Sequence, residues 1–274
     1  GPPGSGKTFS GARLIVGLIE SGKKVGVTAN SHKAINNLLE ETEEAAEEKS
    51  TRFKGLKIAD GDNAFQSKLT TPMITNGGHE GANEAGINLT AGTAWHYCRD
   101  DVEMVDYLFV DEAGQISLAD ALAMSTKAHT VVLLGDPQQL PQVAQARHPE
   151  GSGVSVLEHL LGEHQTIPND RGVFLDKTWR LHPAVTEFIS ELMYDGRLES
   201  ESTLDRQNIR ASGSLSGVGL RWLPVETQGM SQSSPEEAGV ISAAIEGLLS
   251  GSAVCTDADG LDRRLVPEDI LVVS

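Results

Sequence analysis

Cysteine, aromatic residues and long apolar runs are all scarce in this sequence. The two cysteines, Cys98 and Cys255, lie far apart and form no CxxC pair, and aromatic residues make up 4% of the chain. A disulfide framework and a zinc cluster of cysteines are therefore excluded. No stretch approaches the roughly 18 consecutive apolar residues of a membrane-spanning helix, so we expect no membrane partner. This balance is typical of a soluble protein of the reducing cytosol, and we expect a cytoplasmic location.

Positive charge is scarce as well: 22 lysines and arginines face 39 aspartates and glutamates, which gives a net charge of −17. This argues against a general basic surface that coats nucleic acid or membrane, but it leaves room for a local basic groove. Hydrophobic residues make up 39% of the chain, enough to bury a core. Part of the acidic excess is one run that we interpret as the solvated face of a helix: Glu40, Glu41, Glu43, Glu44, Glu47 and Glu48.

Predicted strands and helices alternate along the chain, which favours an α/β fold with parallel sheets flanked by helices. A polar turn between 162 and 172 predicts a domain boundary, with domains of residues 1–168 and 169–274. In the first domain we expect an irregular connection over 60–86, helices at 9–20, from 31, at 118–124 and 157–161, and strands at 24–28, 56–59, 87–92, 107–110 and 130–134. In the second we expect helices at 183–194 and 235–249 and strands at 173–175, 219–225 and 269–274.

The two ends of the sequence predict a piece of a longer polypeptide. The chain opens directly on a glycine-rich loop of a kind that normally follows a buried strand, so we expect the first domain to lack its first strand. It stops within an apolar run that reads as a core strand, so we expect the second domain to be truncated.

The sequence begins GPPGSGKT, which matches the pattern GxxxxGK[ST] of a phosphate-binding loop. Gly4, Ser5 and Gly6 would let backbone N–H groups curl around a phosphate. Lys7 would place its charge on the β- and γ-phosphates, and Thr8 would offer its hydroxyl to Mg²⁺ at the N-terminus of the following helix. We therefore expect a nucleoside triphosphate with Mg²⁺ at this loop.

A second motif is the apolar segment 107–110, which is followed directly by Asp111 and Glu112. In a parallel α/β sheet, ligands bind at the carboxyl ends of the strands. There Asp111 would hold the Mg²⁺ through water, and Glu112 would orient and deprotonate the attacking water. A strand that ends in Asp-Glu is common by itself, and only its pairing with the phosphate loop makes it informative.

The second motif extends to Gln115, as Asp111-Glu-Ala-Gly-Gln115, and two further motifs follow in order: Leu134-Gly-Asp-Pro-Gln-Gln-Leu-Pro141 and Thr178-Trp-Arg-Leu-His-Pro183. With the phosphate loop, this ordered set resembles superfamily 1 helicases of the B branch, which include the nonsense-mediated-decay helicase and the Okazaki-fragment nuclease–helicase. The last motif, with Tyr194-Asp-Gly-Arg197, looks most like bacterial proteins that fuse a RecB-like nuclease to such a helicase. The resemblance covers nearly the whole chain, from the first helicase motif to just past the fourth. It implies a P-loop NTPase with tandem RecA-like domains and ATP as its nucleotide.

The resemblance also implies roles in the ATP site. Gln139 would sense the γ-phosphate, and Gln115 would tie the two carboxylates to that response. Arg180 would act as an arginine finger, because a guanidinium neutralises charge on the transferring phosphoryl group; the alternative for Arg180 is a structural ion pair. Trp179 matches the position that stacks on adenine, and a packed core aromatic is the alternative. We interpret His182 as a structural hydrogen-bonding residue, and the other histidines form no ligand-like cluster, so we expect no metal site on protein side chains beyond the Mg²⁺ held with ATP.

Two segments match family motifs that hold the nucleic-acid backbone. In Thr28-Ala-Asn-Ser-His-Lys33, Asn30, Ser31 and the helix N-terminus would hold a phosphate, and Ser31 would also suit a helix cap. In Gly92-Thr-Ala-Trp95, Thr93 would take another phosphate or serve only as a strand-end hydroxyl. Backbone contacts predict sequence-independent binding of a single strand. The likeness to nuclease fusions favours DNA, and RNA stays open.

The motif set thus predicts an ATP hydrolase of the helicase or translocase type that moves 5′ to 3′ on a single strand. The polarity rests on the resemblance alone, and so does the expectation of a nuclease domain in the same polypeptide. Because the two late helicase motifs are not in the sequence, we expect the segment alone not to unwind a duplex. Two alternatives stay open: another P-loop enzyme, an AAA+ ATPase or a small-molecule kinase, and a nucleotide-gated nucleic-acid clamp that does not move.

Overall fold

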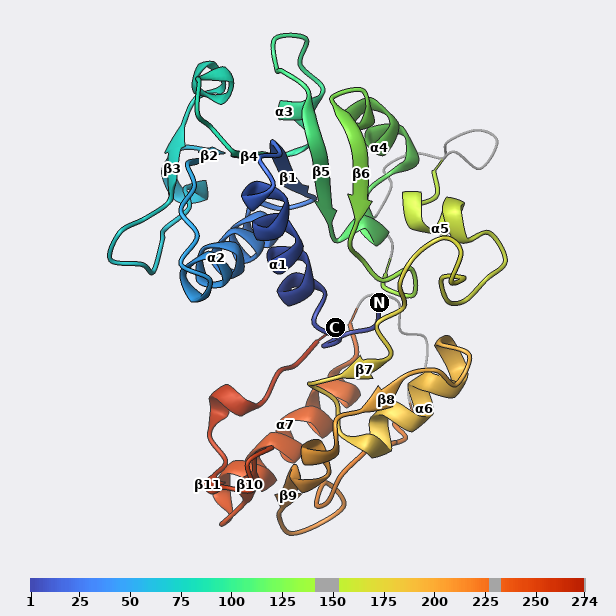
Figure 1. Cartoon of the computed structure of the whole chain (residues 1–274). Helices are drawn as coiled ribbons and strands as arrows, with labels where there is room; N and C mark the ends of the chain where they lie inside the picture. Colours follow the sequence, from blue (N-terminus) through green and yellow to red (C-terminus); the bar gives the residue numbers. More distant parts are fainter. Residues whose placement is uncertain (141–152, 227–232, 274) are drawn as a thin grey trace. The chain divides into compact units, whose positions relative to one another are not determined.

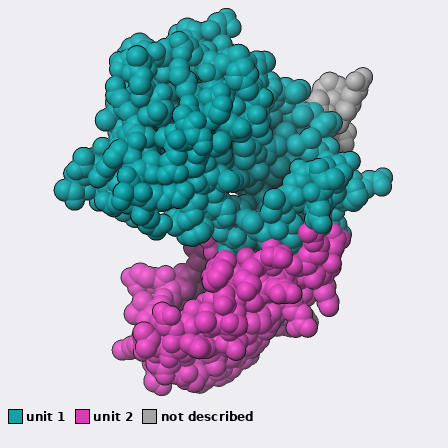
Figure 2. Space-filling model, in the orientation of Figure 1, with its two compact units in different colours: residues 1–175 teal, residues 176–274 magenta. Residues whose placement is uncertain are grey.

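A computed structural model describes residues 1–140, 153–226 and 233–273 of the chain (Figure 1). The chain divides into two compact units, residues 1–175 and 176–274, coloured separately in Figure 2. The division falls a few residues after the predicted boundary at 168, and the assignment of the two domains stays a prediction.

The first unit is built on a six-stranded sheet with the order β3-β2-β4-β1-β5-β6, in which all neighbours run parallel (Figure 1). Strand β1 is buried along its whole length, as expected for a central strand that is covered on both faces. The predicted α/β fold of a P-loop NTPase is confirmed. The strands are β1 (Val25–Ala29), β2 (Gly55–Ile58), β3 (Ile74–Gly77), β4 (Leu89–Ala91), β5 (Val105–Asp111) and β6 (Ala128–Leu133).

Helices cover both faces of this sheet, and each face has its own apolar core. Successive side chains of β5 point to opposite faces, so Phe109 joins the core under α1 and α2, whereas Leu108 joins the core under α3, α4 and α5. The helices are α1 (Lys7–Glu20), α2 (His32–Glu48), α3 (Ala94–Tyr97), α4 (Leu118–Ser125) and α5 (Val156–Leu161). The structure confirms the helices predicted at 9–20, 118–124 and 157–161.

The connection over 60–86 is more regular than predicted, because it contains β3 and two 3₁₀ turns, η1 (Gly61–Asn63) and η2 (His79–Asn83). Strand β3 has the sequence Ile-Thr-Asn-Gly and lies at the edge of the sheet, where Thr75 and Asn76 are exposed. An edge strand of this kind lacks the apolar pattern on which strand prediction depends. The prediction of irregular structure is therefore wrong for residues 74–77.

The acidic run of α2 is only partly solvated, and its interpretation is wrong for Glu43, which is 1% exposed. The Glu43 carboxylate accepts hydrogen bonds from the backbone N–H groups of Met73 (2.7 Å) and Ile74 (2.9 Å) and from the Ser67 hydroxyl. It therefore satisfies backbone donors at the start of β3, which would otherwise be buried without an acceptor. The exposed members of the run are Glu44, Glu47 and Glu48.

The second unit contains two longer helices, a parallel two-stranded pair and an antiparallel sheet of order β11-β10-β9. Both predicted helices are confirmed. The strands predicted at 173–175, 219–225 and 269–274 are wrong over the residues that the structure describes, because no neighbouring strand pairs with these backbones and a β-branched run forms a strand only with a partner. The elements are β7 (Lys177–Thr178), α6 (Pro183–Met193), β8 (Glu199–Ser200), η5 (Ser202–Arg206), β9 (Asn208–Arg210), α7 (Pro235–Ser250), β10 (Val254–Thr256), β11 (Asp262–Arg264) and η6 (Pro267–Asp269).

Candidate functional site: a nucleotide site beside a nucleic-acid face

The phosphate loop runs directly into α1, which begins at Lys7. Gly4 and Gly6 have φ angles of 70° and 77°, in the left-handed region that favours glycine. Gly6 is the N-cap of α1 and no side chain caps it, so the first N–H groups of the helix stay available to a ligand. The Ser5 hydroxyl donates to the Pro2 carbonyl at 2.7 Å and fixes the curve of the loop. This cradle of N–H groups at a 14-residue helix fits a phosphate group.

The Lys7 side chain folds back over the loop. Its Nζ donates to the carbonyl oxygens of Gly1 at 2.7 Å and Pro2 at 2.9 Å. The Lys7 charge also acts on Asp111, where it opposes part of the rise that burial causes in the pKa of that carboxyl. The ammonium thus lies between the loop and the end of β5, where it can exchange carbonyl oxygens for phosphate oxygens. Thr8 follows at the start of α1 and is half-buried.

Asp111 is the last residue of β5 and is 6% exposed. Burial raises the pKa of Asp111 above its ordinary value, the hydrogen bond from the Glu112 N–H (2.9 Å) lowers it, and the charge of Glu112 raises it further. A buried carboxylate with a raised pKa and a lysine nearby is typical of a site that receives a cation and a phosphate. The Asp111 carboxylate and the Thr8 hydroxyl are oxygen donors of the kind that Mg²⁺ prefers.

Glu112 adopts a left-handed backbone conformation, with φ 52° and ψ 38°. Such a conformation costs a non-glycine residue on the order of 1–2 kcal/mol. The residue begins the turn η3 (Ala113–Gln115), and its side chain is half-buried. Backbone strain of this kind concentrates at functional sites, where the side chain must point in one direction.

The turn after β5 and the turn after β6 touch through their backbones. The Ala113 N–H donates to the Leu134 carbonyl at 2.8 Å. A Cβ atom at Gly114 would lie 2.3 Å from the carbonyl oxygen of Asp136, and one at Gly135 would lie 2.9 Å from two backbone nitrogens of η3. Both positions therefore require glycine, and the close approach couples the carboxylate turn to the turn that carries Gln139.

Asp136 is a site residue to which we assign no role from the sequence. It is 2% exposed, and its carboxylate accepts the Gln138 N–H at 3.0 Å. Its carbonyl also accepts the Gln139 N–H at 3.4 Å, so Asp136 shapes the turn and leaves the Gln139 side chain exposed. The sequence Gly-Asp-Pro-Gln-Gln could have indicated this turn-forming role of Asp136, because Asp before Pro is common in turns.

Of the residues predicted to contact nucleic acid, Asn30 touches the turn that carries Gln115. Asn30 follows β1, and its side-chain amide donates to Gln115 Oε1 at 3.4 Å, which links the strand motif to the turn after β5. Ser31 caps α2 by accepting the Ala34 N–H at 3.1 Å, so the cap interpretation is confirmed. Thr93 precedes α3 and makes no side-chain cap, which leaves its half-exposed hydroxyl available.

The second unit carries the remaining predicted residues. Trp179 is 64% exposed, with Lys177 Nζ 5.9 Å from the centre of its ring, so the alternative of a packed core aromatic is wrong. Arg180 is exposed and forms no ion pair within the described part of the chain. His182 caps α6 by accepting the Ala184 N–H at 3.0 Å, which confirms its structural role.

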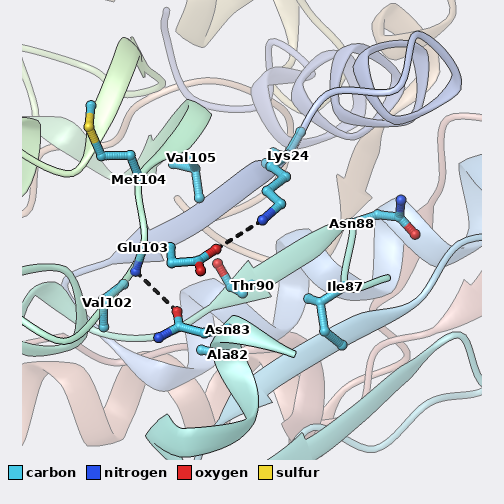
Figure 3. A pocket seen from close by; sticks show the side chains of 11 residues that line it. Lys24, Ala82, Asn83, Ile87, Asn88, Thr90, Val102, Glu103, Met104 and Val105 are labelled. Atoms are coloured by element: carbon cyan, nitrogen blue, oxygen red, sulfur yellow. Dashed lines mark hydrogen bonds and ion pairs between the residues drawn. The ribbon is translucent and has the colours of Figure 1, made fainter. Parts of the chain in front are cut away.

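A small cavity lies at the opposite edge of the sheet, where β1, β4 and β5 begin (Figure 3). Lys24 and Glu103 form an ion pair at 3.0 Å across it, and the Asn83 side chain accepts the Glu103 N–H at 3.0 Å. Its volume of about 20 Å³ suits a water molecule and not a nucleotide. Among the described residues, no cluster of three metal-ligating side chains occurs. No helix in the described ranges has the length and apolar character to cross a bilayer.

Comparison with known proteins shows the family to which this chain belongs. The sequence matches the AAA domain family over residues 1–210, and the chain belongs to that family. It is 25% identical over 225 residues to the DNA replication ATP-dependent helicase/nuclease DNA2 of Xenopus laevis, a match that covers 74% of this chain and 19% of that protein. It is 31% identical over 108 residues to the probable helicase MAGATAMA 3 of Arabidopsis thaliana, which covers 38% of this chain and 13% of that protein.

These relatives are much longer proteins, and the chain spans less than a fifth of their length. A solved structure of arterivirus nonstructural protein 10, a helicase, with DNA superposes with a TM-score of 0.46 at 19% identity, over 73% of this chain and 40% of that chain. The family and the helicase relatives confirm the superfamily 1 helicase resemblance at the level of the class. The likeness to RecB-like nuclease fusions stays a prediction.

Proposed function

We propose that the protein hydrolyses ATP in order to move 5′ to 3′ along single-stranded nucleic acid, with DNA as the preferred strand. The observation that carries the proposal is the backbone contact between Gly114 and Asp136, because it joins the carboxylate turn to the glutamine turn beside the phosphate loop. The relatives named as helicases, one of them a DNA replication helicase/nuclease, support the choice of activity and of DNA. The polarity rests on the motif resemblance alone.

Each site residue of the first unit would have its own role in ATP binding and hydrolysis. The loop N–H groups and Lys7 would bind the phosphates, and Thr8 and Asp111 would hold Mg²⁺, which supplies positive charge to the phosphoryl group. Glu112 would orient and deprotonate the attacking water. Gln139 would sense the γ-phosphate from the adjacent turn.

Coupling to the strand would run through Gln115 and Asn30, because these side chains are hydrogen-bonded to one another. A change at the γ-phosphate that shifts η3 would then shift the Asn30 amide, which with Ser31 and Thr93 would hold backbone phosphates. From the second unit, Trp179 would stack on adenine, and Arg180 would neutralise charge on the transferring phosphoryl group; both roles rest on the motif resemblance. Repeated cycles of ATP binding and hydrolysis would step the protein along the strand.

The experiment that tests these roles uses the variant Glu112→Gln in the full-length protein. The amide keeps the shape of the side chain but accepts no proton, so hydrolysis should fall by about 100-fold or more while ATP affinity is retained. The exposed Glu47→Gln on α2 is the matched control and should hydrolyse ATP normally. Steady-state hydrolysis that survives in Glu112→Gln would remove Glu112 as the base. ATP-dependent strand binding without any turnover in the unmodified protein would favour a static clamp instead.

A further inference from the structure

Four side chains that are distant in the sequence meet beside the carboxyl ends of β2 and β4. Lys57 Nζ lies 3.1 Å from His32 Nδ1. His79 Nδ1 lies 2.9 Å from His96 Nδ1, and the two imidazole rings stack with their centres 5.1 Å apart. The charge of Lys57 acts on both His32 and His96, which joins the two pairs. We call these four residues the histidine–lysine cluster.

The cluster has an inner and an outer layer. Lys57 is fully buried in β2, and His96 in α3 is 1% exposed. His32 at the start of α2 and His79 at the start of η2 are each half-exposed. A ligand from solvent would therefore meet the two outer imidazoles first and lie over the buried ammonium.

The inner layer lacks an anion. Burial lowers the pKa of Lys57 to about 8, so the amine is mostly protonated at neutral pH. Within the described residues its hydrogen-bond partner is an imidazole, and no carboxylate pairs with it. His96 Nε2 is also buried and makes no hydrogen bond to any described residue. Because buried charges in proteins are normally compensated, the Lys57 ammonium indicates that a negatively charged ligand binds here. The neutral His96 Nε2 adds a buried polar atom that still needs a hydrogen-bond partner.

The nearby acids do not supply that charge. Burial and then the charge of Lys57 lower the pKa of His32, and Asp60 opposes them only in part. Burial, followed by His79, Arg99 and Lys57, lowers the pKa of His96 to about 4 against the opposing charge of Asp101. The Asp101 carboxylate is already held by the Arg99 guanidinium at 2.9 and 2.7 Å.

The position of the cluster identifies the anion. His32 follows Asn30 and Ser31 directly, and His96 lies in the short helix that Thr93 precedes. The cluster therefore lies between the two segments that we assign to backbone phosphates. A divalent cation is disfavoured, because the Lys57 ammonium would repel it and the described residues hold no three-ligand group.

We propose that the histidine–lysine cluster binds a backbone phosphate of the nucleic-acid strand, and that His32 takes up a proton as the strand binds. This inference rests on the proposed function, because it takes its ligand from it. The phosphate neutralises Lys57 and so removes the charge that, after burial, holds down the pKa of His32. Linkage then requires strand affinity to rise on acidification, by up to about tenfold per pH unit for one proton taken up.

The test is strand binding by the full-length protein, measured by fluorescence anisotropy with a labelled oligothymidylate between pH 6 and pH 8 at constant ionic strength. The double variant His32→Gln/His79→Gln should lose most of the pH dependence and bind about three- to tenfold more weakly at pH 6, with little change at pH 8. The exposed His129→Gln on β6 is the matched control and should keep the full pH dependence. The Lys57→Met variant should also lose the pH dependence. It should stay folded, because the substitution removes a buried charge.

The imidazole resonances give a second readout, since strand binding should raise the pKa of His32. A pH dependence that is the same in the double variant and in the unmodified protein would overturn the inference while leaving the proposed function intact. No strand binding at any pH would overturn both. If inorganic phosphate shifts the two imidazoles and the strand does not compete with it, the site holds a free anion and the assignment to the strand is wrong.

Discussion

The contact between Gly114 and Asp136 makes Gly114→Ala the most informative single change in the nucleotide site. The new Cβ would lie 2.3 Å from the Asp136 carbonyl oxygen, whereas Cβ atoms essentially never approach within 3.0 Å, so the two turns must separate by at least about 0.7 Å. The Asp136 oxygen belongs to the backbone, so it cannot rotate away from the new Cβ as a side chain would. Overpacking of this kind costs about 1–3 kcal/mol of stability.

The catalytic effect should be larger than the stability effect suggests. The turn that moves carries Glu112 on one side and Gln115 on the other, and a misplacement of about 1 Å near the reacting groups can reduce the rate about 100-fold. We therefore expect kcat for ATP hydrolysis to fall about 10- to 100-fold, measured with saturating strand on protein that circular dichroism shows to be folded.

Gly17→Ala is the matched control for this change. Gly17 lies inside α1, the helix that begins at Lys7, and nothing lies within 4 Å of a Cβ built there. The control should gain about 0.5–1 kcal/mol of stability and keep its kcat. A folded Gly114→Ala protein with kcat within twofold of the unmodified protein would refute the argument that the two turns are coupled.

Two further predictions concern buried carboxylates. Burial raises the pKa of Asp111, so the folded state binds the proton more tightly than the unfolded state does. The folded state therefore loses stability as the pH rises from the ordinary pKa of Asp through the raised one. Asp111→Asn should raise the melting temperature at pH 7 and not in acid, and it should abolish Mg²⁺-dependent hydrolysis. Glu43→Ala should cost about 3 kcal/mol in urea unfolding and expose the Met73 and Ile74 amides to hydrogen exchange, whereas the exposed Glu47→Ala should stay within about 0.5 kcal/mol. Unchanged melting of Asp111→Asn at pH 7, or equal losses for the two glutamate variants, would contradict these arguments.

Local patterns were sufficient to predict the parts of the site that are continuous in sequence. The phosphate loop, the strand that ends in Asp111 and the cap at Ser31 are each read from a few adjacent residues, because helix starts and strand ends depend on local chemistry. The α/β class follows from the alternation of strands and helices.

Features that depend on partners distant in the sequence could not be predicted. Glu43 looks like any other glutamate of its run until β3 brings two N–H groups to it. The requirement for glycine at position 114 becomes visible only when the turn after β6 is in place. The histidine–lysine cluster draws on four elements, so no motif in the sequence marks it.

The ATPase rate of the full-length protein tests the central claim most directly. It should be measured without nucleic acid, with single-stranded DNA and with single-stranded RNA, for the unmodified protein, for Lys7→Ala and for the exposed control Lys23→Ala. Our account predicts strong stimulation by a single strand, larger with DNA, that disappears in Lys7→Ala and persists in Lys23→Ala. A rate that is indifferent to both polymers would contradict the account and assign this phosphate loop to another class of ATPase.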